Sequence, residues 1–171
     1  MAVLAHGTVG LQHASMAIYN AWCDRVPVYI ILGSYNDAAT RRGAEWYHGV
    51  QDAASMVRDY TKWDDTPWSL THFAESAVRA YKVALTPPMA PVVLVVDGQL
   101  QEEGVDRSGK LSVPKLTLPV PPQGDSGAVA ELARMLVAAE TPVLVVDRLA
   151  RTPAAMPLLM ELAETLQAAV I

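Results

Sequence analysis

The sequence has little of what cross-links a protein, anchors it in a membrane or charges it strongly. It contains one cysteine, Cys23, so no internal disulfide can form, and no cysteine–histidine spacing indicates a structural zinc site. The longest apolar runs, residues 26–32 and 91–96, are far shorter than the roughly 18 residues that a membrane-spanning helix needs. We therefore expect no interaction with a membrane and a fold held together by buried apolar side chains.

The sequence also has few charged residues, and this limits the classes of partner that it can be expected to bind. Charged residues make up 18% of the 171 residues, and the formal net charge is −5. A nucleic-acid partner is not expected, because such surfaces need clustered lysine and arginine. No basic region precedes an apolar stretch at the start of the chain, so a secretory signal is not indicated and a cytoplasmic location is expected. The 51% of hydrophobic residues suffice for a sizeable core.

Short apolar runs alternate with stretches of helical periodicity along the chain. This pattern is typical of an α/β fold with a mainly parallel sheet flanked by helices. The runs are continuous rather than alternating, as expected for strands that are covered on both faces. The predicted strands are residues 2–5, 26–32, 92–96, 143–146 and 169–171. The predicted helices are residues 11–24, 50–60, 69–84, 126–139 and 153–168.

A segment rich in glycine, proline and charge interrupts the pattern. Periodicity disappears at residue 99, and we interpret residues 105–125 as an extended, proline-rich linker between units 1–104 and 126–171. Both units look incomplete, because the second has only two predicted strands and a stable sheet generally needs about three. We therefore expect a piece of a longer protein. A compact single domain with short edge strands is the alternative.

The loop from His6 to Gly10 joins the first predicted strand to the first predicted helix. Ligands of open α/β sheets bind beyond the carboxyl ends of the strands, beside helix N-termini. His6 could act there as a general acid or base, because an imidazole exchanges protons near neutral pH. A hydrogen-bonded structural histidine is the alternative for His6. A tight turn is the alternative for the glycines, whose spacing matches no nucleotide-binding motif.

Three further polar residues are candidates for the same site. His13 lies in the first turn of the predicted helix, near enough to His6 to share a pocket. His48 and Gln51 follow the second strand after a long loop, and loops of this kind often form the walls of a site. The alternative for His48 and Gln51 is the solvated start of a helix. No metal site is predicted, because the histidines lack further ligands nearby.

Several short segments then occur in an order that resembles a known family. They are Asn20-Ala21-Trp22, Ile30-Ile31-Leu32-Gly33, Gln51-Asp52-Ala53-Ala54, Thr61-Lys62-Trp63, Ala90-Pro91-Val92-Val93-Leu94, Pro142-Val143-Leu144-Val145 and Leu162-Ala163-Glu164. Together they resemble the thiamine diphosphate-dependent enzymes of the acetolactate synthase and benzoylformate decarboxylase type. The resemblance implies that residues 1–104 are the second half of a pyrimidine-binding domain and that residues 126–171 begin a cofactor-free central domain.

The resemblance also implies an activity and its partners. Family members are 2-keto-acid decarboxylases or carboligases that use thiamine diphosphate and magnesium, and their active sites lie between subunits of a homodimer or homotetramer. The glutamate that contacts the cofactor's pyrimidine ring would precede residue 1, and the Gly-Asp-Gly motif for magnesium and diphosphate would follow residue 171. The chain alone is therefore expected to be inactive and to bind no cofactor tightly.

Carried over by residue, the resemblance gives roles to the candidates. It places His6 at the position of an active-site histidine of benzoylformate decarboxylase-like members, with a role in proton transfer. Gly10 and His13 become cofactor-binding residues, although His13 replaces an asparagine of those members. His48 and Gln51 become walls of the substrate pocket. Acetolactate synthase-like members carry Phe-Gln at the position of His48-Gly49. This difference argues against assigning a synthase substrate to the chain.

Two other interpretations stay open from the sequence. A non-catalytic α/β binding or assembly module could keep this scaffold without the chemistry. A small nucleotide-binding domain would bind an anion in the loop from His6 to Gly10. The coding sequence on either side of the chain would separate the first of these from an enzyme.

Overall fold

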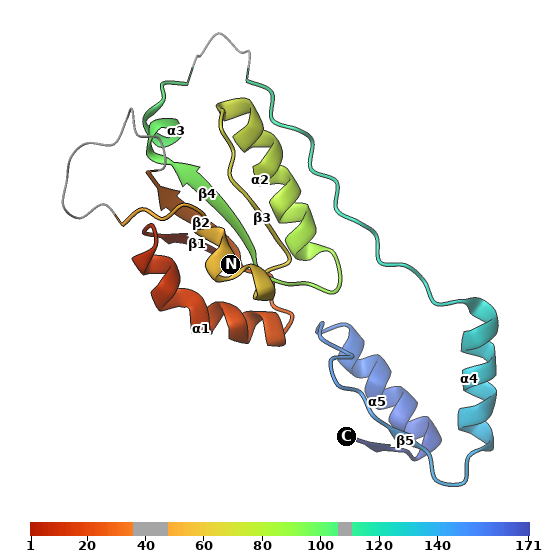
Figure 1. The fold of residues 1–171 in the computed structure, drawn as a ribbon. Helices are drawn as coiled ribbons and strands as arrows, with labels where there is room; N and C mark the ends of the chain where they lie inside the picture. The colour runs from red at the N-terminus through yellow and green to blue at the C-terminus, as the bar shows by residue number, and fades with distance from the viewer. Residues whose placement is uncertain (36–47, 106–110) are drawn as a thin grey trace. The chain divides into compact units, whose positions relative to one another are not determined.

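The computed structural model describes residues 1–35, 48–105 and 111–171 (Figure 1). It divides the chain into two compact units, Met1–Pro121 and Pro122–Ile171. The first unit holds a parallel sheet with helices packed on it, which confirms the predicted α/β fold class. The assignment of residues 1–104, 105–125 and 126–171 to a first domain, a linker and a second domain stays a prediction.

The sheet of the first unit has four strands in the order β1-β2-β4-β3, and all neighbours are parallel. Register pairs Ala5 with Leu32 and Leu32 with Val95, so the carboxyl ends of β1, β2 and β4 lie along one edge. The elements in chain order are β1 (Ala2–Ala5), α1 (Val9–Cys23), β2 (Tyr29–Ser34), η1 (Ala54–Met56), η2 (Arg58–Tyr60), β3 (Trp63–Asp65), α2 (Leu70–Leu85), β4 (Val92–Asp97) and α3 (Gly98–Glu102).

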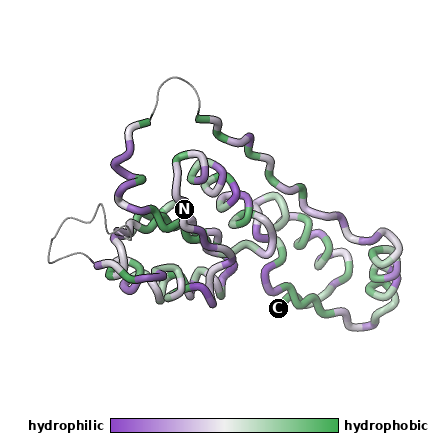
Figure 2. The backbone as a smooth tube through the Cα atoms, turned by 45° about the horizontal axis from the view of Figure 1, so that its top comes forward, coloured by the Kyte–Doolittle hydropathy of each residue, from purple (hydrophilic) through white to green (hydrophobic). Residues whose placement is uncertain are grey.

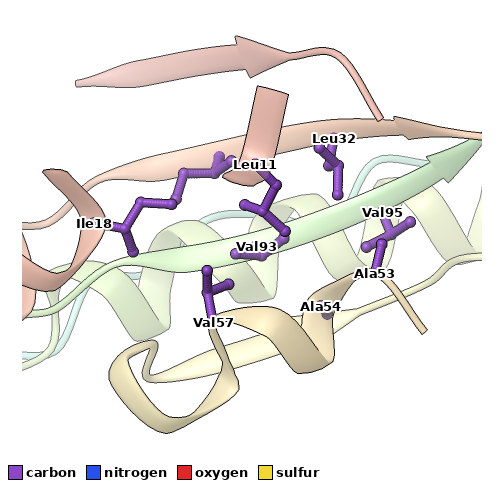
Figure 3. Packing of buried hydrophobic residues seen from close by; sticks show 9 residues of the cluster. Leu11, Ile18, Leu32, Ala53, Ala54, Val57, Val93 and Val95 are labelled. Atoms are coloured by element: carbon purple, nitrogen blue, oxygen red, sulfur yellow. The ribbon is translucent and has the colours of Figure 1, made fainter. Parts of the chain in front are cut away.

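Helices cover both faces of this sheet. On one face, Leu11 and Ile18 of α1 pack with Val57 against Val93 of β4, and Figure 3 shows these side chains gathered between the helix and the strand. On the other face, alanines of α2 pack on Val92 and Leu94 in a second cluster. Every residue of β4 is buried, as its continuous apolar run predicts.

Helix α2 shows how the sequence fixes its ends. It begins after Ser69, whose hydroxyl accepts a hydrogen bond from the His72 N–H at 3.2 Å, as a helix-capping serine does. It buries Ala74, Ala80 and Ala84 on one stripe and ends before Pro87, which cannot continue a helix. The predicted helix over residues 69–84 is confirmed.

The second unit consists of α4 (Ser126–Ala138), β5 (Val143–Leu144), α5 (Ala155–Leu166) and β6 (Ala169–Val170). Its two strands pair in parallel. None of its residues is buried, although hydrophobic stretches colour much of its backbone in Figure 2. Leu132, Met135 and Leu158 are each more than half exposed. This unit therefore has the elements of an α/β layer without a core.

Three local expectations are wrong. Residues 50–60 do not form an α-helix but the two short 3-10 helices η1 and η2. Strand β3 was not predicted, and α3 occupies residues where periodicity was expected to be lost. The carboxylate of Asp97 starts α3 by accepting a hydrogen bond from the Gln99 N–H at 3.0 Å. Among the described helices, none is both long and apolar enough to cross a membrane.

Candidate functional site

A cavity of about 650 Å³ opens at the carboxyl edge of the four-stranded sheet. It is lined by residues that follow the strands, including His6 and Gly7 after β1, Tyr35 after β2, and Gln101 in α3 after β4. Open α/β sheets bind ligands at this edge. The position predicted for His6, beyond the carboxyl end of the first strand, is therefore the position of a cavity.

The structure brings His6 and His48 together. Their ring centroids are 5.5 Å apart, and the rings meet edge to face at 70°. The Nδ1 atom of His6 lies 3.3 Å from the Gly7 carbonyl oxygen, a contact that is a hydrogen bond when this nitrogen carries the proton. Both histidines are exposed and can meet a ligand. Two residues far apart in the sequence thus form one imidazole pair beside the cavity.

Close backbone packing produces this pair. A Cβ atom on Gly7 would lie 2.7 Å from the Gly33 carbonyl oxygen and 3.4 Å from the His48 carbonyl oxygen. Only glycine allows the loop after β1 to approach both segments so closely. The Thr8 hydroxyl also donates a hydrogen bond to the His48 carbonyl oxygen. The segment that carries His48 is therefore joined to the loop that carries His6.

The other candidate residues lie around this pair in different ways. Gly10 is beside it, because a Cβ atom there would lie 3.3 Å from the His6 Cβ. His13 in α1 and Gln51 before η1 are exposed, and neither lines the cavity at the carboxyl edge. The cofactor role of Gly10 and His13 and the wall role of Gln51 stay predictions.

Sequence reasoning missed several residues that line the cavity. The Gln101 side-chain amide donates a hydrogen bond to the Val96 carbonyl oxygen at 2.8 Å, and Glu103 lies beyond it. The Tyr35 ring packs on Gly98, where an added Cβ would lie 2.5 Å from the Tyr35 Cε1. Tyr35 follows β2 and Gln101 follows β4, so the rule that identified His6 could have found both.

An ion-pair network lies close to His48 in the sequence. Arg58 of η2 binds Asp52 on one side and Asp64 of β3 on the other, with nitrogen–oxygen distances of 2.9 Å to each. The hydrogen bonds from Arg58 hold the pKa of Asp52 below its usual value, and the two carboxylates raise the pKa of Arg58. The network fixes the position of Asp52, which follows His48 by four residues.

The chemistry of the cavity suits one part of a thiamine-type cofactor. Its lining is mostly apolar and includes residues such as Ile31 and Phe73, and the described lining residues include no lysine or arginine. The described lining can therefore accept a ring but offers no cation to a diphosphate. Within residues 1–35, 48–105 and 111–171, no group of three or more His, Cys, Asp or Glu side chains could hold a metal ion. The residues described thus fit the ring of the cofactor but not its magnesium diphosphate.

No protein-family model and no curated protein matches the chain. A solved structure does, and it is described as a "putative thiamin diphosphate-dependent enzyme isolated from Mycobacterium smegmatis". The two are 26% identical with a TM-score of 0.77, over 99% of this chain and 31% of the other. The chain thus spans less than a third of the length of the protein it matches. This likeness supports placing the chain with the thiamin diphosphate-dependent enzymes.

Proposed function

We propose that the chain is part of a thiamine diphosphate-dependent 2-keto-acid decarboxylase or carboligase. Residues 1–104 would be the second half of its pyrimidine-binding domain, and residues 126–171 the start of its central domain. The observation that carries this proposal is the match over 99% of the chain, at a TM-score of 0.77, to a protein described as a putative thiamin diphosphate-dependent enzyme. The cavity at the carboxyl edge of the sheet supports it.

The chain would supply one wall of the active site. Its apolar cavity would exclude water from the ring of the cofactor, with Gly10 on the cofactor side. His13 would contact a part of the cofactor outside this cavity, on the solvent side of α1. His6 would hold or accept a proton at an oxygen of the 2-keto acid, since its imidazole is exposed beside the cavity. His48 and Gln51 would bound the substrate. When bound, the cofactor supplies an electron sink for cleavage of the bond to the carboxyl group.

The remaining groups would come from other parts of a longer protein. The described residues supply no metal cluster, so the ligands of magnesium would lie elsewhere. Strand β1 is an edge strand whose Leu4 is 81% exposed, and the second unit buries none of its residues. Both surfaces would be covered in a cytoplasmic homodimer or homotetramer, because open edges and apolar faces favour association.

Calorimetric titration with thiamine diphosphate and magnesium tests the proposal. The 171-residue chain should show no saturable binding and no decarboxylation. The same chain expressed with its flanking coding sequence should bind the cofactor and release carbon dioxide from a 2-keto acid. In that longer protein, His6→Gln should lower turnover and leave cofactor binding intact. Tight binding by the 171-residue chain, or none by the longer protein, would contradict the proposal.

The alternative is a non-catalytic α/β binding or assembly module. The observation that favours it is the apolar lining of the cavity, whose described residues include no cationic side chain. The same experiment separates the two functions. A module predicts that the longer protein folds but neither binds the cofactor nor acts on a 2-keto acid.

A further inference from the structure

We propose that Arg58 is a positioning residue that holds His48 against His6. It reaches neither histidine, so any effect on them passes through the segment that it binds. The importance of this pair for a reaction rests on the proposed function. The positioning itself rests on contacts within the chain and is tested without a cofactor.

Arg58 makes four hydrogen bonds to two carboxylates. Its terminal nitrogens donate to the two oxygens of Asp52 at 2.9 and 3.0 Å. Its Nε and one terminal nitrogen donate to the two oxygens of Asp64 at 2.9 and 3.0 Å. Each carboxylate is therefore bound through both oxygens, which fixes its orientation as well as its distance. A lysine could not reproduce this planar arrangement.

The two carboxylates belong to different parts of the fold. Asp64 lies in β3, which is paired with β4 in register, so its position is set by the sheet. Asp52 lies in the irregular residues 48–53 that precede η1. Its carboxylate also accepts a hydrogen bond from the Ser55 N–H at 3.2 Å, which closes a local turn. Arg58 thus ties this segment to the sheet.

A second tie acts on His48 itself. There the Thr8 hydroxyl binds the carbonyl oxygen of His48. A single hydrogen bond leaves the direction of the His48 ring free to change as the chain after it moves. With Asp52 fixed by Arg58, the chain is held at Asp52 as well as at His48, and the His48 ring stays against His6.

The network is exposed enough to be altered without removing core contacts. The side chains of Arg58 and Asp52 are 47% and 51% exposed, and Asp64 is 18% exposed. An exposed ion pair adds little to global stability, because solvent screens it. We therefore expect substitutions here to change the local position of His48 more than the free energy of unfolding.

Nuclear Overhauser effects between carbon-bound imidazole protons measure the contact directly. The full 171-residue chain would be labelled at its histidines, and signals would be assigned with His6→Gln and His48→Gln. The unaltered chain should show a cross-peak between His6 and His48. In Arg58→Gln the cross-peak should lose most of its intensity, and in Arg58→Lys it should retain an intermediate part of it. The signals of His72 on α2 should not move.

Two further variants make the outcome decisive. Asp52→Asn keeps an oxygen that can accept from the Ser55 N–H but removes the charge that Arg58 binds, so it should also weaken the cross-peak. Arg79→Gln, at an exposed position on α2, makes the same change of side chain away from the network and should leave the cross-peak unaltered. If Arg58→Gln fails to fold, Asp52→Asn decides.

The proposal is wrong if the unaltered chain shows no cross-peak between His6 and His48. It is also wrong if the cross-peak keeps its full intensity in folded Arg58→Gln or in Asp52→Asn. Failure of the longer protein to bind thiamine diphosphate would overturn the proposed function and leave this result in place. The two proposals can therefore fail separately.

Discussion

Replacing Gly7 with alanine tests whether the cavity edge depends on close backbone packing. The added Cβ would lie 2.7 Å from the Gly33 carbonyl oxygen and 3.4 Å from the His48 carbonyl oxygen. Both neighbours are backbone atoms that cannot rotate away, so β1 and β2 must separate at their carboxyl ends. Overpacking of this kind costs roughly 1–3 kcal/mol. We expect Gly7→Ala to lower the free energy of unfolding by about 2 kcal/mol.

Urea unfolding followed by tryptophan fluorescence measures this effect. The four tryptophans all precede residue 122, so the signal reports the first unit. With a slope of about 2 kcal/mol per molar urea, the midpoint should fall by about 1 M. Gly104→Ala is the matched control, because a Cβ there meets nothing within 4 Å, and it should change stability by less than about 0.5 kcal/mol. Equal stability of the two variants would refute the packing argument.

Three other predictions concern the core and two titrating groups. Leu32→Ala, at a fully buried position, should lower the free energy of unfolding by roughly 2–5 kcal/mol in urea. Leu4→Ala, at a position that is 81% exposed, should change the free energy of unfolding by less than about 0.5 kcal/mol. Equal losses of stability in Leu32→Ala and Leu4→Ala would contradict the assigned core. Because Arg58 lowers the pKa of Asp52, the stability from this pair is present above about pH 4 and is lost as pH falls through the lowered pKa. Asp52→Asn should therefore lose less stability on acidification, and an identical pH profile would count against the ion pair. Burial raises the pKa of Tyr29 to about 12, so its contribution is complete below pH 10.0 and is lost as pH rises through about 12. Ultraviolet titration should show a tyrosine phase near pH 12 that disappears in Tyr29→Phe, and persistence of that phase would assign it to another residue.

The strands that carry most of the core could be predicted because their sequence pattern and their burial coincide. Strand β4 is apolar at nearly every position and buried at every position, so no alternation was needed to identify it. Strand β3 gave no such signal, since two of its three residues are aspartates. Asp64 binds Arg58, and Asp65 accepts a hydrogen bond from Ser76. Partners from other elements satisfy these carboxylates, and no local pattern reveals them.

The false helix at residues 50–60 has a related cause. Ala53, Ala54 and Val57 are buried at spacings that resemble one face of a helix. The Asp52 carboxylate and carbonyl oxygen bind Ser55, which favours a tight turn at the start of this segment. Apolar spacing therefore indicated correctly which residues are buried but not the backbone conformation that buries them.

The candidate site likewise has features that local sequence determines and features that depend on residues far apart in the chain. The position of His6 at the carboxyl edge of the sheet could be predicted because the residue directly follows a strand. Its contact with His48 depends on the glycine at position 7, on Thr8 and on how the intervening chain folds, and spacing in the sequence reports none of these. The network of Arg58 was not predicted for the same reason.

The predicted role of His13 depends on the direction in which α1 presents it. Leu11 is fully buried against the sheet, and a residue two positions later on a helix points to roughly the opposite side. His13 is accordingly exposed and does not line the cavity beside His6. A ligand that contacts His13 must therefore approach α1 from its solvent side. If His13 binds the cofactor, the part of the cofactor that it contacts lies on the solvent side of α1 and not in the cavity at the carboxyl edge of the sheet.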